Sequence, residues 1–337
     1  MNRTIKQYIQ NYRGLVLCFM LLLMMAACKK DNLNTAADDN NSITQVIADN
    51  FNLSIFKTVL GRNKLDKKLK EKGPFTALAP SDAAFALAGY TNPTSIITAE
   101  PSVIAGIASY HVLDGRYEFN KLPFQFNQEL RSQNGKLYAT RWIKNSDTVL
   151  TINGSRIVAV NVPASNGLIQ VIDRVLTPYT HDKLGDAVAS EASVTLFYQA
   201  LKSSGVLSSL NGTDVFTVFS PSNDAMKAYG FATLEQIRGT NVEVLKHLVN
   251  YHIVRDRRFV YDYILSTKSS TAIKQATMDG GNTININLIE DNSQIGGFSG
   301  ITLRGLVNGS DVNVLKRDVL TGNGVLHVID GVLISTP

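Results

Sequence analysis

Apolar and polar positions follow one another along the chain in a pattern that predicts short buried strands and amphipathic helices. Phe75 to Ala79 is a short, mostly apolar run, which suits a buried strand. The mostly apolar runs Leu168 to Leu176 and Val325 to Leu333 predict central strands. Apolar residues recur at helical spacing from Val103 to Val112 and from Val242 to Ile253. Strands and helices therefore both contribute to the predicted fold, which is of the α+β class.

Short polar motifs mark where these elements begin and turn. The side-chain oxygens of Ser81 and Asp82 can accept hydrogen bonds from the free N–H groups of a helix that starts at Ala83. A phosphate site at that helix N-terminus is the alternative interpretation. The dipeptides Asn166-Gly167 and Asn323-Gly324 are typical of hairpin turns. A hairpin is therefore expected before each of the two closing strands.

Three segments occur twice in the same order, which indicates a duplicated domain. The matching pairs are Phe75–Phe85 with Phe216–Met226, Tyr110–Leu113 with Tyr251–Val254, and Asn166–Leu176 with Asn323–Leu333. The first two pairs share one offset along the chain and the third pair has a larger one, so the second copy carries a net insertion. So long a period excludes a solenoid and predicts two tandem domains, at 43–178 and 181–337.

The insertion lies between the Tyr-His pair of the second copy and its closing strand. Thr283 to Ile289 alternates apolar and polar residues for most of its length, which predicts a half-exposed strand. The Gly-rich segment Ile295 to Ile301 predicts a loop with Phe298 at its tip. We therefore expect an inserted hairpin in the second domain. Its Phe298 either provides a docking surface or belongs to a longer solvated hairpin without a role.

The ordered set of motifs resembles the fasciclin domain. It consists of an apolar strand ending in Pro-Ser-Asp or Pro-Ser-Asn before a helix, then Tyr-His, then Asn-Gly and a closing strand containing Val-Ile-Asp. The resemblance implies two tandem fasciclin domains, each a β-sandwich or wedge of about seven strands flanked by several α-helices. The first copy departs from the pattern at Gln170, where the family often has the histidine that the second copy has at His327.

The resemblance also supplies candidate interaction residues, because the Tyr-His region of the family has been linked to cell adhesion. They are Tyr110, His111, Tyr251 and His252, to which Phe298 is added. The alternative is structural, with a buried histidine whose ring nitrogen bonds a backbone carbonyl and a tyrosine packed beside it. A residue serves both roles only if its outer edge stays exposed.

The N-terminus predicts export and a lipid anchor. Three basic residues precede a short apolar run, Leu15 to Met25. A membrane-spanning helix needs about 20 residues and this run is much shorter, so residues 1–27 are predicted to be a signal peptide. Ala26-Ala27-Cys28 resembles the bacterial lipobox, which implies that Cys28 is lipidated; ordinary secretory cleavage near Ala27 is the alternative. Residues 28–42 predict a flexible tether, and the lipid bilayer is the predicted partner of the N-terminal acyl chains.

The residues after Cys28 and the net charge of the chain limit where the protein is expected to act and which partners it is expected to bind. Lys29 follows the cysteine where the familiar inner-membrane retention signal has Asp, and the next charged residues resemble the surface-export signal of Bacteroidota lipoproteins. We therefore expect an outer-membrane protein that faces outward, with a periplasm-facing orientation as the alternative. Residues 28–337 contain 30 basic and 28 acidic side chains, so no strong attraction to nucleic acid is predicted. No cysteine follows Cys28, which excludes a disulfide within the folded part.

The sequence carries none of the common catalytic patterns. The sequence contains no G-x-S-x-G elbow, P-loop, H-E-x-x-H or EF-hand pattern. His247 and His252 are five positions apart, which places them on different faces of a helix and argues against a shared metal. Asp173 and Asp330 lie in the closing strands and are expected to find backbone N–H or hydroxyl partners. No catalytic residue, metal site or cofactor is therefore predicted.

Two functional hypotheses remain. The first is a lipid-anchored surface protein that mediates adhesion or protein–protein contact, with an unknown surface protein or polysaccharide as its partner. The second is an accessory surface lipoprotein of a nutrient-uptake complex that binds glycan, peptide or a SusC/SusD-type transporter. Exposed aromatic residues in a shallow groove would favour glycan, and Trp142, Tyr138 and Phe298 are the candidates.

Overall fold

The structure, a computed structural model, describes residues 41–294 and 296–335. The predicted signal peptide, Cys28 and nearly all of the predicted tether lie outside the described residues. The chain from Asn40 onward forms one compact unit. Its hydrophobic core clusters all lie between Ile43 and Leu333, so residues 41–337 contain the complete cores of both repeats. This part of the chain therefore has what it needs to fold without the preceding residues.

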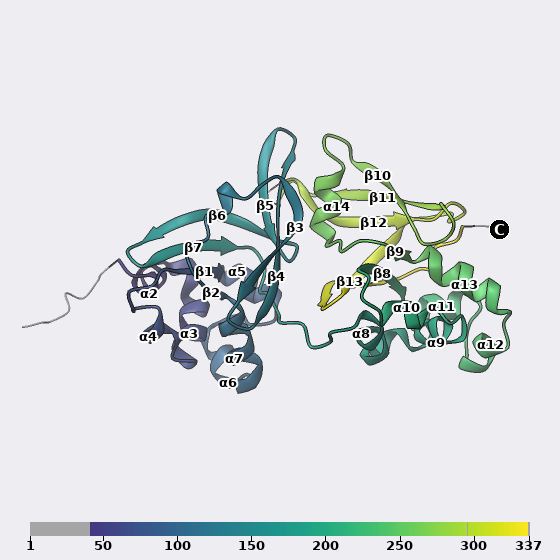
Figure 1. The fold of residues 1–337 in the computed structure, drawn as a ribbon, viewed down its shortest axis with the longest axis horizontal. Helices are drawn as coiled ribbons and strands as arrows, with labels where there is room; N and C mark the ends of the chain where they lie inside the picture. The colour runs from purple at the N-terminus through teal and green to yellow at the C-terminus, as the bar shows by residue number, and fades with distance from the viewer. Residues whose placement is uncertain (1–40, 295, 336–337) are drawn as a thin grey trace, which may run out of the picture. The chain divides into compact units, whose positions relative to one another are not determined.

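The first repeat forms a seven-stranded sheet and several short helices (Figure 1). Its helical elements are α2 (Ile43–Ala48), η1 (Phe51–Leu53), α3 (Ser54–Arg62), α4 (Leu65–Lys68), α5 (Asp82–Leu87), α6 (Pro93–Thr98), α7 (Pro101–Tyr110) and η2 (Phe119–Lys121). Its strands are β1 (Phe75–Pro80), β2 (Val112–Asp114), β3 (Gln125–Ser132), β4 (Gly135–Lys144), β5 (Asp147–Ile152), β6 (Ser155–Ala164) and β7 (Gly167–Ile172). The strand order is β2-β1-β7-β6-β5-β4-β3.

The second repeat has the same architecture. Its helical elements are α8 (Leu184–Ser190), η3 (Ala192–Val194), α9 (Thr195–Ser203), α10 (Leu207–Leu210), α11 (Asn223–Tyr229), α12 (Leu234–Arg238), α13 (Val242–Tyr251) and α14 (Val260–Ser266). Its strands are β8 (Phe216–Pro221), β9 (Ile253–Val254), β10 (Ala272–Ala276), β11 (Thr283–Glu290), β12 (Phe298–Arg304), β13 (Val312–Thr321) and β14 (Gly324–Ile329). The strand order is β10-β11-β12-β13-β14-β8-β9. Read from β9 to β10, it corresponds strand for strand to the order of the first sheet.

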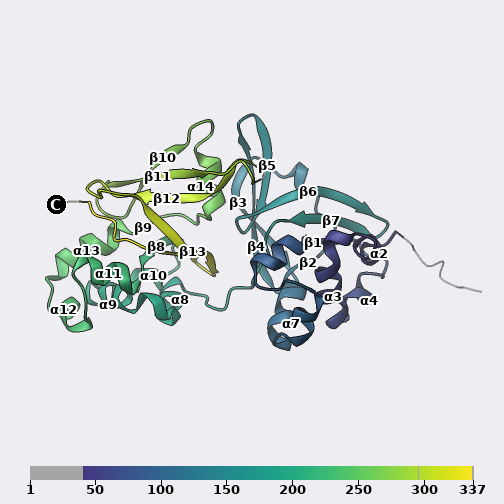
Figure 2. The same cartoon turned by 180° about the vertical axis from the view of Figure 1, so that it is seen from behind.

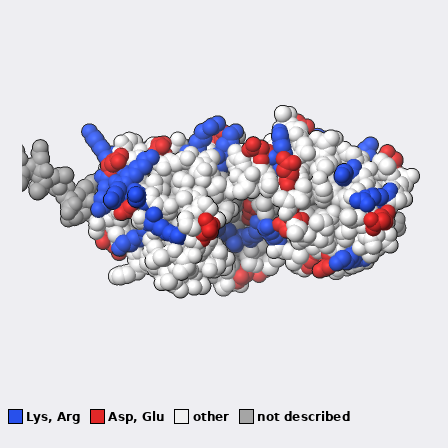
Figure 3. Space-filling model, turned by 90° about the horizontal axis from the view of Figure 1, so that it is seen from below, with Lys and Arg blue, Asp and Glu red and all other residues white. Residues whose placement is uncertain are grey.

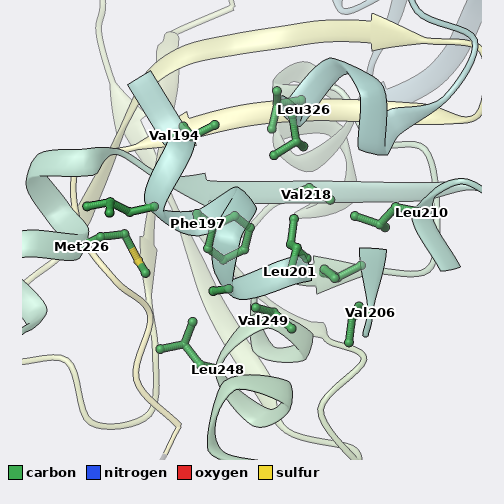
Figure 4. Packing of buried hydrophobic residues seen from close by; sticks show 14 of the residues in the cluster. Val194, Phe197, Leu201, Val206, Leu210, Val218, Met226, Leu248, Val249 and Leu326 are labelled. Atoms are coloured by element: carbon green, nitrogen blue, oxygen red, sulfur yellow. The ribbon is translucent and has the colours of Figure 1, made fainter. Parts of the chain in front are cut away.

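The predicted fold class is confirmed, because each repeat combines seven strands with flanking helices. In each sheet the first and last strands of the repeat pair in parallel, β1 with β7 and β8 with β14. The α-helices other than α14 pack against this part of the sheet, as Figures 1 and 2 show, whereas α14 packs against β11 and β12. In the second repeat Phe197 of α9 packs among residues of β8, α11, α13 and β14 (Figure 4). The parallel pair therefore forms the centre of each core.

The predicted helix cap is confirmed for Ser81 and for its counterpart Ser222, but was wrong for Asp82, which is itself the first residue of α5. Ser81 Oγ accepts a hydrogen bond from Ala84 N at 3.1 Å, and Ser222 Oγ does the same for Ala225 N at 3.1 Å. The carboxylate of Asp82 points to another helix, where it accepts from Ser54 Oγ and from Ile55 N at the start of α3. The acidic side chain therefore caps α3, an arrangement that supports the structural interpretation of this motif over a phosphate site.

The prediction of an inserted hairpin in the second domain was wrong. Its β11 and β12 correspond to β4 and β5 of the first domain, so the described residues contain no additional hairpin. The extra length is distributed instead: α14 replaces the short η2, and the connections after β11 and after β12 are longer than their counterparts. Phe298 is also not at a loop tip. It is the first residue of β12, and its ring is half-buried.

The Asn-Gly dipeptides lie at hairpins, but for a reason other than turn geometry. The two residues of the first turn are Ser165 and Asn166, and Gly167 already pairs with Ala164 in the ladder. A Cβ on Gly167 would lie 2.0 Å from Phe75 O, and one on Gly324 would lie 2.2 Å from Phe216 O. Glycine is therefore needed for the close approach of the parallel strand.

None of the helices in residues 41–294 and 296–335 has the length and apolar character needed to span a bilayer.

Candidate functional site

Both Tyr-His pairs lie at the end of a helix, as predicted, but inside the core. His111 Nδ1 lies 2.7 Å from Ile107 O, and Leu176 N donates to His111 Nε2 at 3.1 Å. His252 repeats the arrangement, with Leu248 O at 2.8 Å and Leu333 N at 2.9 Å. Each ring therefore carries its proton on Nδ1 and accepts on Nε2, which ties a helix end to the segment after the closing strand.

Burial determines the charge state of these rings. Desolvation lowers the pKa of His111 and of His252 to about 4, outweighing the opposite effect of the helix carbonyl that each ring bonds. A proton added at Nε2 would also face a backbone N–H in place of the lone pair that accepts it now. Both rings are therefore neutral at physiological pH.

The tyrosine of each pair is equally enclosed. Tyr110 Oη donates to Lys136 O at 2.6 Å and accepts from Asn153 Nδ2 at 2.9 Å, and burial raises its pKa. Tyr251 Oη donates to Thr283 O at 2.8 Å, and burial likewise raises its pKa. All four Tyr-His side chains have a relative exposure of 0%. This is the structural alternative raised above; an interaction role for these side chains stays a prediction and would require the fold to open.

Gln170, which replaces the histidine found at His327 in the second copy, makes equivalent hydrogen bonds. Gln170 Oε1 accepts from Asn161 N at 2.8 Å, and His327 Nδ1 accepts from Asp318 N at 3.1 Å. On the other side Gln170 Nε2 donates to Tyr117 O at 3.3 Å, and His327 Nε2 bonds Arg258 O at 3.0 Å. An amide and an imidazole thus hold equivalent strands together.

Strand β4 carries a set of contacts that the sequence analysis missed. Its odd positions Leu137 and Ala139 face the core of the first domain. Its even positions Tyr138, Thr140, Trp142 and Lys144 face residues of the second domain. Both faces of the strand are therefore used, which explains why Leu137 to Thr140 are buried without interruption.

The even positions of β4 make specific polar contacts. Thr140 Oγ1 donates to Asp262 Oδ1 at 3.0 Å, and Lys144 Nζ donates to Thr267 Oγ1 at 2.6 Å. The guanidinium carbon of Arg257 lies 3.8 Å from the ring centroid of Tyr138, a cation–π geometry. Burial raises the pKa of Asp262 to about 6, although Phe259 N and Thr140 both donate to its carboxylate. These contacts fasten β4 to both ends of α14, through Asp262 in its first turn and Thr267 at its C-cap.

Removing the hydroxyl of Thr140 tests this contact. We expect Thr140→Val to lower the free energy of unfolding by about 1–3 kcal/mol, because a buried carboxylate loses a hydrogen-bond donor. Urea denaturation at pH 7 measures the change. Thr148→Val is the matched control, because Thr148 is exposed on β5. Equal stability of the two variants would contradict a contribution of the Thr140–Asp262 bond.

An apolar groove lies beside these contacts and is the best candidate interaction site. It has a volume of about 370 Å³ and is lined by Phe124, Trp142, Ile143, Asn145, Ser146, Lys268 and Ser269. Phe124 and Ile143 are 47% and 48% exposed. The Arg141 guanidinium lies 4.1 Å from the Phe124 ring centroid, and Trp142 packs on Phe126 with centroids 4.7 Å apart. The groove thus presents fixed aromatic and aliphatic surface to solvent.

The three aromatic residues proposed from the sequence as glycan-binding candidates lie in different environments. Trp142 lines the groove, whereas Tyr138 is 4% exposed and packs with residues of the second domain. The Phe298 ring centroid lies 4.9 Å from Lys144 Nζ. Phe124 and Ile143 were missed; the nearby Asn145-Ser146 turn is a sequence signal for Ile143, but Phe124 lies far from that turn in the sequence.

The titratable side chains of the described residues form no cluster that points to catalysis. No group of three or more His, Cys, Asp or Glu that could hold a metal occurs in the described part of the chain. His247 bonds Asp279 at 2.8 Å, and His252 is enclosed in the core. The expected partners of Asp173 are confirmed, because its carboxylate accepts from Ser155 Oγ and Arg156 N. Asp330, which is exposed, accepts from Asn313 N.

Comparison with known proteins identifies the family. The family model described as Fasciclin domain matches residues 51–178 and 192–335. The chain belongs to the fasciclin family. A solved FAS1 domain pair from the insect cell adhesion molecule Fasciclin I aligns with 84% of this chain and 97% of its own, at 20% identity and a TM-score of 0.40.

Several curated proteins match most of the chain. Human periostin is 28% identical over 272 residues, covering 81% of this chain and 30% of its own length. Pig transforming growth factor-beta-induced protein ig-h3 is 26% identical over 271 residues, covering 80% and 36%. Drosophila melanogaster Fasciclin-1 is 22% identical over 303 residues, covering 85% and 44%. The chain thus spans less than half the length of these relatives.

Proposed function

We propose that this chain is a lipid-anchored outer-membrane protein that faces outward and acts in adhesion or protein–protein contact. The observation that carries the proposal is that two fasciclin domains account for nearly all of residues 51–335, and that fasciclin-domain proteins take part in adhesion or protein interaction. The exposed groove around Phe124 and Ile143 supports it, because it offers apolar surface to a partner. The buried Tyr-His pairs contribute by holding the fold together.

The anchor is tested separately from adhesion. Cys28 directly follows the apolar run and two small residues, as expected for a lipidated cysteine. Globomycin, which blocks the lipoprotein signal peptidase, is expected to leave the signal peptide attached and so to raise the mass of the protein. An unchanged mass after treatment would rule out lipobox processing. Protease treatment of intact cells then distinguishes the outward from the periplasmic orientation.

Adhesion is tested at the groove. Cells that display the protein are expected to bind each other or a surface partner, and Ile143→Asp is expected to reduce this binding because it places a charge in the apolar groove. Leu315→Asp is the matched control, since Leu315 is 61% exposed on β13 and does not line the groove. A similar loss in both variants, or in neither, would remove the groove from the proposal.

A second candidate function is favoured by the aromatic lining of the same groove. Trp142 and Phe124 offer ring faces of the kind that bind glycans, so the chain could serve as an accessory lipoprotein of a SusC/SusD-type uptake complex. Pull-down from crosslinked cells decides between the two candidates. A co-purifying transporter or glycan supports nutrient uptake, whereas a surface protein on a neighbouring cell supports adhesion.

A further inference from the structure

The net positive charge of the folded part comes from one short segment of the first domain. Residues 57–72 contain seven basic and two acidic side chains, whereas the rest of 41–337 contains 21 basic and 23 acidic ones. The segment covers part of α3, α4 and the approach to β1. Figure 3 shows Lys and Arg side chains gathered at the end of the first domain where the described chain begins.

Five lysines of this segment are free to meet a partner. They form what we call the lysine patch: Lys57, Lys64, Lys67, Lys70 and Lys72. All five are exposed, and the described residues provide no ion pair for any of them. The other two cations of the segment are already engaged. Lys68 pairs with Asp114 at 3.4 Å, and Arg62 donates to the carbonyls of Ile96 and Ala99.

The lysine patch lies next to the point where the chain enters the domain. Thr44 Oγ1 donates to Asp66 O at 2.8 Å, within the patch segment. Asn166 accepts from Ile43 N at 2.9 Å and donates to Leu69 O at 2.7 Å, so it bonds both segments at once. A protein anchored at Cys28 is therefore held to its membrane from the same end of the domain that carries the patch. The chain from Cys28 to Asn41 reaches at most roughly 45 Å.

We propose that the lysine patch docks on the phosphate-bearing headgroups of an anionic membrane surface. Ammonium groups near such a surface are attracted to it, and the attraction adds up over neighbouring lysines. The rest of the folded part has a small net negative charge, so the attraction would also set which end of the domain faces the lipid. The identity of this membrane with the one that holds the lipid anchor rests on the proposed function. The attraction of the lysine patch to anionic lipid does not depend on the proposed function.

Vesicle binding tests the patch without the anchor. The chain from Asn41 to Pro337, which contains both cores, is expected to sediment with vesicles of phosphatidylglycerol and not with those of phosphatidylcholine. Lys64→Gln, Lys67→Gln, Lys70→Gln and Lys72→Gln together are expected to weaken binding by about fivefold for each lysine, or roughly several hundredfold in total. Added salt is expected to release the wild-type chain, because it screens exposed charges.

A matched variant controls for overall charge. Lys202→Gln, Lys227→Gln, Lys246→Gln and Lys274→Gln remove four exposed lysines of the second domain, and this variant is expected to bind much more tightly than the patch variant. Equal losses in the two variants, or equal binding to both lipids, would overturn the proposal. Binding to a soluble acidic polysaccharide without binding to phosphatidylglycerol would overturn it too. The globomycin result bears only on the anchor, so the two proposals fail separately.

Discussion

Lowering the pH from 7 to 4 is expected to remove about 3 kcal/mol of folding free energy at each of His111 and His252. Burial lowers the pKa of both rings from 6.5 to about 4 in the folded state. Between these values the unfolded chain binds the proton more readily, so the stability from each ring is complete above pH 6.5 and is lost as the pH falls towards 4. His327 acts in the same direction, because burial also lowers its pKa.

One buried carboxyl group opposes this loss. The pKa of Asp262 is raised by burial from 3.8 to about 6, so the folded state binds its proton first as the pH falls. Protonation of Asp262 therefore stabilises the folded state between pH 6 and 3.8, by about 2 kcal/mol. The net loss in the wild-type protein is then smaller than the two histidines alone would give.

Single-histidine variants separate these contributions. His252→Gln is expected to be less stable than wild type at pH 7, because Gln does not reproduce both ring hydrogen bonds, but to lose less stability on acidification. Urea denaturation at a series of pH values between 7 and 4 measures the slope. Asn323→Ala is the control, since it removes a buried group that does not titrate and is expected to keep the wild-type slope. A wild-type slope in both His111→Gln and His252→Gln would contradict the assignment.

The domain organisation could be predicted from the sequence because the chain contains two copies of one domain, whose sequences can be compared with each other. Phe75–Phe85 and Phe216–Met226 lie far apart in the chain and still share a strand, a proline and a capping serine. Such local devices depend on neighbours in sequence, so their roles could be inferred without the fold. The location of the extra length in the second copy could not, because a net offset does not show that this length is spread over α14 and two connections.

The candidate site was harder to predict, because its contacts join distant segments. The role of His111 depends on Leu176 N, 65 residues away, and that of Thr140 depends on Asp262, 122 residues away. The sequence of β4 does not indicate that both of its faces are buried, or against what. A polar residue such as Lys144 on that face gives a weak signal, since its partners Thr267 and Ser270 are visible only in the fold.

Asn323→Ala is expected to lower the free energy of unfolding by about 3–5 kcal/mol. Asn323 is 6% exposed, accepts from Leu184 N at 2.7 Å and donates to Leu210 O at 2.9 Å. Alanine leaves this N–H and carbonyl buried without partners, at about 1–3 kcal/mol for each group, and adds a small cavity. Urea denaturation measures the loss. Asn292→Ala is the control, because Asn292 is exposed in the connection after β11.

The replacement Asn323→Asp tests the same contact more sharply. The carboxylate retains an acceptor for Leu184 N but offers no donor, and it faces the carbonyl oxygen of Leu210. We therefore expect Asn323→Asp to be at least as destabilising as Asn323→Ala at pH 7, and to recover partly at low pH, where the protonated carboxyl group can donate a hydrogen bond to Leu210 O. Wild-type stability in the Asp variant would show that the amide donor is unimportant. The Asn-Gly dipeptide would then be needed only for its glycine, whose missing Cβ admits Phe216 O.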